Sequence, residues 1–160
     1  MNEPFRIEGL DGPADLDGVQ AVDRESFPSP WTRAMYEQEL LNTGVAFIIV
    51  ARTAGTEVAG YCSYRLVAEE LQINNVAVRP EHRRLGIGRA LVEAAVAHGR
   101  RGGARMAVLE VRRSNAGAQA LYIRLGFRQI GQRPRYYEHP EEDALIFAAD
   151  VRKLGQDPAA

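Results

Sequence analysis

A carboxylate inside an apolar segment is the side chain of this sequence best suited to act as a base. Glu110 stands within Val108–Val111, whose other members belong in a protein core. An ionised carboxylate there is costly unless it is paired or opens onto a cavity, and apolar surroundings raise a carboxyl pKa toward the working pH of a general base. An ion pair with Arg112 or Arg105 is the alternative interpretation.

The other potentially reactive side chains have structural interpretations first. Tyr122 shares the apolar face of a predicted helix, so its ring is expected in the core with its hydroxyl hydrogen-bonded. Cys62, the single cysteine, lies in an apolar strand pattern and is expected to be a buried thiol. His82, His98 and His139 lack the spacing of metal ligands, so they are expected at the surface and no metal site is predicted.

A turn with two glycines and several arginines joins a predicted strand to a predicted helix. Val76–Val78 end an apolar run, Pro80 cannot continue a strand ladder, and a helical pattern follows Gly88. Glycines at 86 and 88 let backbone N–H groups turn outward at the start of that helix, where they lack partners and the helix dipole favours an anion. Positive charge is added by Arg83, Arg84 and Arg89. The turn therefore predicts a pyrophosphate-binding site.

Two known phosphate motifs fit this turn less well, and an ordinary solvated loop is the remaining alternative. The P-loop requires Gly-Lys-Ser/Thr, whereas the only lysine is Lys153. The dinucleotide fingerprint would find a glycine where Leu91 stands, and it allows only a tight turn between the strand and the first glycine. A pair of glycines alone is a weak signal.

Composition indicates one globular domain without a general affinity for polyanions. The chain has 160 residues, 46% hydrophobic and 26% charged, and a net charge of −1. We expect one domain over residues 1–154 and a flexible tail over 155–160. Neither nucleic acid nor membrane binding is expected from this charge. The longest apolar run, 45–51, is too short to span a membrane, and the N-terminus lacks signal-peptide features, so a cytoplasmic location is expected.

The periodicity of the chain predicts an α/β fold with a mixed sheet, in which strands and helices are interleaved. Ser114 is the expected N-cap of the helix that carries Tyr122, and residues 138–143 are expected to form an acidic loop. The predicted helices are 16–27, 32–42, 89–101 and 115–125, and the predicted strands are 5–10, 45–52, 58–68, 71–78, 106–111, 127–132 and 145–151.

Two motifs resemble those of the GNAT acetyltransferases. Arg83-Arg84-Leu85-Gly86-Ile87-Gly88 matches the Q/R-x-x-G-x-G/A acyl-CoA signature, and Leu121-Tyr122 with Leu125-Gly126-Phe127 resembles the A-L-Y-x-x-x-G-F stretch. The resemblance implies a single-domain GNAT fold, a mostly antiparallel mixed sheet flanked by helices, and acetyl-CoA as cosubstrate without a metal. It implies that Tyr122 protonates the leaving thiolate. The implied cofactor-binding residues are Val76, Ala77 and Val78 for the pantetheine arm, Arg84, Leu85, Gly86, Ile87, Gly88 and Arg89 for the pyrophosphate, and Asn115.

Three further segments, 27–31, 109–115 and 133–137, are similar to the RimI subfamily. Its members acetylate the N-terminal alanine of a small-subunit ribosomal protein, which implies Glu110 as base and a protein N-terminus as acceptor. Trp31, Tyr136 and Tyr137 are then expected to border the acceptor groove. The inserted Ser29–Pro30 departs from the commoner F-P-W and alters the acceptor loop.

Other roles stay open at the level of sequence. Some GNAT enzymes use a carboxylate just before the fourth strand, which makes Glu69 and Glu70 rival bases. A GNAT enzyme could also act on lysine side chains or on a small amine. A CoA-binding regulator without turnover would need neither Glu110 nor Tyr122, so their presence argues against it.

Overall fold

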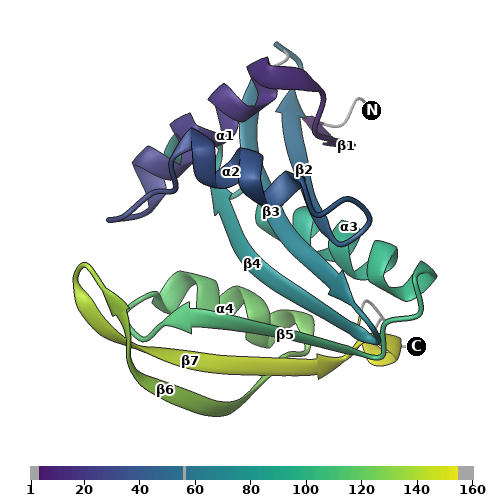
Figure 1. Ribbon diagram of the computed structural model, residues 1–160, viewed down its shortest axis with the longest axis vertical. Coiled ribbons are helices and arrows are strands. Elements are labelled where there is room, and N and C mark those ends of the chain that lie inside the picture. Colours follow the sequence, from purple (N-terminus) through teal and green to yellow (C-terminus); the bar gives the residue numbers. More distant parts are fainter. Residues whose placement is uncertain (1–3, 56, 155–160) are drawn as a thin grey trace.

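The computed structural model describes residues 4–55 and 57–154 as a seven-stranded sheet with helices on both faces (Figure 1). The strands follow the order β1-β2-β3-β4-β5-β7-β6, and only β4 and β5 are parallel neighbours. The predicted mixed, mostly antiparallel sheet is therefore confirmed, whereas the predicted tail lies outside the described residues. The strands are β1 Phe5–Gly9, β2 Ala46–Thr53, β3 Val58–Val67, β4 Glu70–Val78, β5 Met106–Arg112, β6 Arg128–Glu138 and β7 Glu141–Asp150.

Four α-helices connect these strands, and each begins or ends at a residue that the sequence marks. The extended Phe27 ends the first, just before the two prolines of the next loop, and Thr32 caps the second by accepting a hydrogen bond from Met35 N–H at 3.2 Å. Asn115, not the predicted Ser114, caps the last, because its Oδ1 accepts from Ala118 N–H at 3.1 Å. The helices are α1 Gly12–Ser26, α2 Arg33–Leu40, α3 Ile87–Arg101 and α4 Ala116–Leu125, with 3-10 turns at Pro80–His82 and Val151–Lys153.

The core has one layer on each face of the sheet. On one face α3 and α4 cover β3, β4 and β5, with Leu91 and Ala95 fully buried against Leu71. On the other face α1 and α2 cover β2 and β3, with Val19 and Val22 fully buried. No helix among residues 4–55 and 57–154 is long and apolar enough to cross a membrane.

The pairing of β4 with β5 stops partway along the two strands. The last pair is Ile73 with Leu109, although both strands continue for several residues. At this point β4 carries a bulge, because Ser63 pairs with Asn75 while the adjacent Tyr64 pairs with Ile73. A bulge bends a strand and ends regular pairing. The strands therefore diverge, and Figure 1 shows β4 and β5 meeting at one end and opening like a V at the other.

The last two strands are longer than predicted, and the expected acidic loop is wrong. β6 continues to Glu138 and β7 begins at Glu141, so only His139 and Pro140 form the turn between them. The sequence of β6 does not alternate between apolar and polar residues, because β6 is an edge strand that is exposed over nearly its whole length. The acidic residues after Tyr137 consequently lie on paired strands, where Glu142 opposes Tyr137.

A buried carboxylate joins α1, α2 and β3. Asp23, which is 1% exposed, accepts hydrogen bonds from the hydroxyls of Tyr36 and Tyr61, and these two hydroxyls lie 3.2 Å apart. Burial raises the pKa of Asp23, and the two tyrosine hydrogen bonds oppose that rise. The two phenols therefore keep the pKa of Asp23 lower than burial alone would set it.

We expect Tyr61→Phe to destabilise the protein by about 1–3 kcal/mol at pH 7, the usual cost of leaving a buried polar group with fewer partners. The variant raises the folded-state pKa of Asp23 further above its unfolded value, which penalises folding only above the unfolded pKa. The loss should consequently shrink as the pH falls through the raised folded-state pKa of Asp23, and it should be largely gone below the ordinary value of about 3.8. Urea denaturation at pH 7 and pH 3 measures it, with Tyr64→Phe as the control, since that hydroxyl contacts the half-buried His98. Equal losses at both pH values would contradict this account.

Candidate active site

Glu110 is the first residue of β5 beyond its pairing with β4. Its side chain is 28% exposed, and Arg133 Nε lies 3.0 Å from its Oε1. The predicted ion-pair partners are wrong, because Arg112 pairs with Glu142 and Arg105 lies near Glu69. Glu110 therefore opens onto the cleft between the strands, and its ion-pair partner Arg133 is exposed.

The two tyrosines at the end of β6 reach Glu110 because β6 is bulged. Between the pairs Arg133–Ala144 and Tyr137–Glu142, β6 advances four residues and β7 only two. Arg135 takes a positive φ of 54° within this bulge. Hydrogen bonding to the Glu110 carboxylate raises the pKa of Tyr136. Burial, followed by the charge of Glu110, raises the pKa of Tyr137 to about 12.

Tyr122 faces the same region from α4. It is 5% exposed and packs edge-on against Phe127, with ring centroids 5.7 Å apart. Burial raises the pKa of Tyr122, and the charges of Cys62 and Tyr137 would raise it further. Its phenol is therefore protonated at neutral pH. Cys62 is fully buried and its pKa is raised by burial, which confirms the predicted structural thiol.

The glycine-containing turn has the geometry of an anion site. Arg84 and Gly86 both take positive φ angles, 67° and 82°, and no side chain of the described residues caps the helix at Gly86. Among the amides of residues 84–90, that of Ala90 is the first with a backbone partner, the Gly86 carbonyl at 3.0 Å. The amides of residues 84–89 are therefore available to a ligand. Leu85 is 46% exposed beside them, whereas Ile87 is buried.

The remaining residues of the predicted phosphate site have additional structural roles. A Cβ on Gly88 would come within 3.3 Å of Leu121 Cδ2, so this glycine also allows α3 to approach α4. Arg89 pairs with Glu93 at 2.6 Å one turn along α3. Val76 and Val78 are half-buried against the α3 side of the sheet, while Ala77 faces the α1 side.

Arg79 supports this turn, and sequence reasoning missed it. Its Nε donates to the Val58 carbonyl at 2.8 Å, and its Nη1 lies 3.7 Å from Glu25 and 3.5 Å from Glu57. The side chain is 14% exposed. Arg79 therefore ties the start of the turn to α1 and to the β2–β3 connection. Its place directly before Pro80, at the end of a strand, was the available signal.

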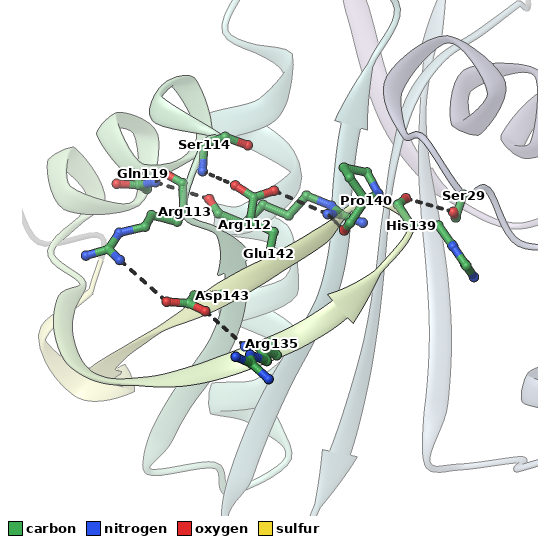
Figure 2. A network of polar contacts seen from close by, with 10 residues as sticks. All are labelled: Ser29, Arg112, Arg113, Ser114, Gln119, Arg135, His139, Pro140, Glu142 and Asp143. Carbon is green, nitrogen blue, oxygen red and sulfur yellow. Dashed lines mark hydrogen bonds and ion pairs between the residues drawn. The ribbon is translucent and has the colours of Figure 1, made fainter.

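The residues predicted to border an acceptor groove come from two parts of the chain, which meet where Ser29 contacts His139. Trp31 is half-buried and packs on Tyr36 with ring centroids 5.2 Å apart, so it belongs partly to the core. The inserted Ser29 donates its hydroxyl to the His139 carbonyl at 3.1 Å, which links the α1–α2 loop to the β6–β7 turn (Figure 2). The open end of the V is therefore bridged.

Several predicted candidates lie away from the cleft. Glu70 stands opposite Met106 where β4 and β5 are still paired, and Glu69 is 67% exposed beside Arg105. Both rival bases are therefore at the closed end. The surface prediction is confirmed for His139 and wrong for His98, which is half-buried and lies 2.7 Å from the Tyr64 hydroxyl. Within the described part of the chain, no His, Cys, Asp and Glu side chains cluster as metal ligands.

Comparison with known proteins identifies the class of protein that this fold and cleft define. Residues 16–127 match the acetyltransferase (GNAT) family, and the chain belongs to that family. The protein is therefore an acetyltransferase, as the two sequence motifs predicted.

Individual relatives narrow the similarity within the family. A Bacillus subtilis protein, named as a candidate [ribosomal protein bS18]-alanine N-acetyltransferase, is 40% identical over 87% of this chain and 91% of its own. The N-alpha-acetyltransferase RimI of Mycobacterium tuberculosis is 33% identical over 92% of this chain and 94% of its own. The crystal structure of the Escherichia coli ribosomal-protein-S18-alanine N-acetyltransferase superposes with a TM-score of 0.82 at 29% identity, covering 96% of this chain and 97% of the other. The predicted resemblance to RimI enzymes is confirmed.

We expect Leu85→Glu to weaken acetyl-CoA binding by about tenfold or more, because a carboxylate beside the free amides would repel the pyrophosphate. Isothermal titration calorimetry measures the affinity, and a fixed concentration of acetyl-CoA should raise the melting temperature of the variant less than that of the parent. Leu41→Glu makes the same charge change at a leucine that is 73% exposed and far along the chain from the turn. Parental affinity in Leu85→Glu would show that the turn does not hold the phosphates.

Proposed function

We propose that this acetyltransferase moves the acetyl group of acetyl-CoA to the N-terminal α-amine of a protein. The expected acceptor is the N-terminal alanine of a small-subunit ribosomal protein. Support comes from the names of the relatives described above and from their nearly full-length coverage. The observation that carries the proposal is the cleft that opens where β4 and β5 separate, with Glu110 at its first unpaired position.

Acetyl-CoA would lie across this opening. The free amides of the glycine turn fit the pyrophosphate, and the unpaired edge of Val76, Ala77 and Val78 fits the amide groups of the pantetheine arm. Asn115 lies at the entrance to α4, where its side chain already caps the helix. The thioester would then reach the region between Glu110 on β5 and Tyr122 on α4.

The chemistry assigned to these residues is direct transfer. Glu110, through a water molecule, accepts a proton from the α-ammonium group, and the free amine attacks the thioester carbonyl. When the tetrahedral intermediate collapses, the C–S bond breaks, and Tyr122 donates its proton to the departing sulfur. The nitrogen loses its second proton to solvent, which leaves a neutral amide, and the Tyr122 phenolate takes up a proton from solvent. An α-amine has a pKa near 8 and a lysine near 10.4, so an α-amine is the easier group for a carboxylate to deprotonate at neutral pH.

The acceptor class is tested by a panel of peptides assayed with acetyl-CoA. The peptides begin with free Ala, Ser or Met, or carry a blocked N-terminus with one internal lysine. We expect acetylation of the free N-termini, with Ala preferred, and little turnover of the blocked peptide. Faster acetylation of the internal lysine would favour a lysine acetyltransferase, and binding of acetyl-CoA without any turnover would indicate a CoA-binding regulator.

We expect Glu110→Gln to lower kcat/KM by about 10²–10⁴, the usual contribution of a general base. Glu70→Gln is the matched control, since Glu70 is a β4 carboxylate at the closed end of the cleft, and it should change kcat/KM by less than about threefold. Steady-state kinetics with the preferred peptide at pH 7 compares the two. A loss in Glu70→Gln as large as that in Glu110→Gln would move the base to β4.

Tyr122→Phe separates a catalytic phenol from a core residue, because it removes one hydroxyl and keeps the ring. A proton donor to sulfur predicts a fall in kcat of about 10²-fold at pH 7, with acetyl-CoA affinity and melting temperature nearly unchanged. The defect should shrink above roughly pH 8.5, where a thiolate leaves without a proton. Parental kcat together with a lowered melting temperature would make Tyr122 structural.

A further inference from the structure

Arg112, at the last position of β5, contacts the β6–β7 hairpin in three ways. Its Nη1 donates to the Pro140 carbonyl at 3.1 Å and to Glu142 Oε1 at 3.2 Å, as Figure 2 shows. Its guanidinium carbon also lies 4.2 Å from the centre of the Tyr137 ring. The side chain is 16% exposed, so these contacts are largely shielded from water. Together they hold the hairpin and Tyr137 against the end of β5.

Glu142 extends this contact to α4. While its Oε1 binds Arg112, its Oε2 accepts the Ser114 N–H at 2.5 Å, directly before the Asn115 cap (Figure 2). Gln119, one turn into α4, donates to the Arg112 and Arg113 carbonyls at 3.2 and 2.9 Å. One ion pair therefore joins the hairpin, the end of β5 and the start of α4.

These three elements carry the groups of the cleft. Tyr136 and Tyr137 end β6, Glu110 lies two residues before Arg112 on β5, and Tyr122 lies on α4. The charge of Glu110 raises the pKa of Tyr137, and a Tyr137 phenolate would raise that of Tyr122, so Tyr137 lies within electrostatic reach of both groups. A shift of the hairpin would change the position of Tyr137 relative to both.

The adjacent pair Arg113–Asp143 provides a built-in comparison. It joins the same two segments at 3.4 Å, but Arg113 is 61% exposed. No ring contact accompanies it among the described residues. Exposed pairs of this kind contribute little to structure. The two neighbouring arginines thus share a sequence context and differ in burial and in contact with Tyr137.

We propose that Arg112 and Glu142 are positioning residues for the transfer reaction. The pair fixes Tyr137 at the acceptor end of the cleft. It acts through Tyr137, and it does not itself exchange a proton with either substrate. This assignment rests on the proposed acetyl transfer to an amine.

The first test compares Arg112→Gln with Arg113→Gln. We expect Arg112→Gln to lower kcat/KM for the acceptor peptide by about tenfold to a hundredfold, as misplaced groups do, with the Kd of acetyl-CoA within about threefold of the parent. Arg113→Gln should stay within about threefold in both. Arg112→Lys should not restore the activity, because an ammonium lacks the planar fork that binds Glu142 and stacks on a ring. Parental kcat/KM in Arg112→Gln would overturn the proposal.

A double-mutant cycle tests whether Arg112 acts through Tyr137. In a Tyr137→Ala background, Arg112→Gln should cost less than about threefold in kcat/KM, because the side chain it positions is absent. The full loss in that background would overturn the route through Tyr137. If Arg112→Gln does not fold at the assay temperature, the cycle is run with Glu142→Gln, which keeps the shape of the side chain and removes its charge.

Hydrogen exchange provides a readout that does not depend on activity. Amides of residues 136–142 should exchange at least tenfold faster in Arg112→Gln than in Arg113→Gln, and unchanged exchange would overturn the positioning role. Failure of the proposed function looks different, since the parent would then acetylate none of the N-terminal peptides while the exchange result stood. If the parent instead prefers another amine, the ratio of variant to parent kcat/KM is measured on that acceptor, with the same expectation.

Discussion

The separation of β4 from β5 is the constraint on which the rest of the structure depends. Parallel pairing ends at Ile73 and Leu109, because the bulge at Asn74 turns β4 away while β5 continues beside β7. A sheet that parts in its middle exposes backbone groups in the interior, where they require partners. The cleft therefore provides a strand edge for a ligand's amides and places the next residue of β5, Glu110, at its mouth.

The two halves of the sheet are held together at both ends of this opening. At the narrow end, α3 and the core around Leu71 and Ala107 cover the paired strands. At the wide end, Ser29 reaches the His139 carbonyl, so the loop after α1 touches the β6–β7 turn. Contacts within the chain thus limit the opening at both ends. Arg79 on one half and Arg112 on the other anchor segments beside the opening.

Sequence reasoning identified the elements that depend on local signals. The strand, turn and helix around Gly86 could be predicted from signals within a few residues of one another. The spacing of apolar residues indicates the strand and the helix, and the proline and glycines indicate the turn between them. The burial of Tyr122 followed from helical spacing. The partner of Glu110 could not be found, because Arg133 lies on β6, which is separated from β5 by β7 in the sheet. The full length of β6 could not be predicted, because this exposed strand has no alternation of apolar and polar residues. The burial of His98 could not be predicted either, because it depends on the tertiary contact with Tyr64.

The positive charges of this site are guanidinium groups. Lys153 is the only lysine among the 20 Lys and Arg residues, and the ion pairs of the described residues use arginine apart from the contact of His82 with Glu57. A guanidinium is protonated at every physiological pH and is therefore a poor nucleophile. A thioester held beside Arg112 and Arg133 would therefore meet no lysine side chain that it could acylate. The ion pairs of the site keep their charge at any concentration of acetyl donor, and Lys153, exposed beyond β7, is the one side-chain amine open to that reaction.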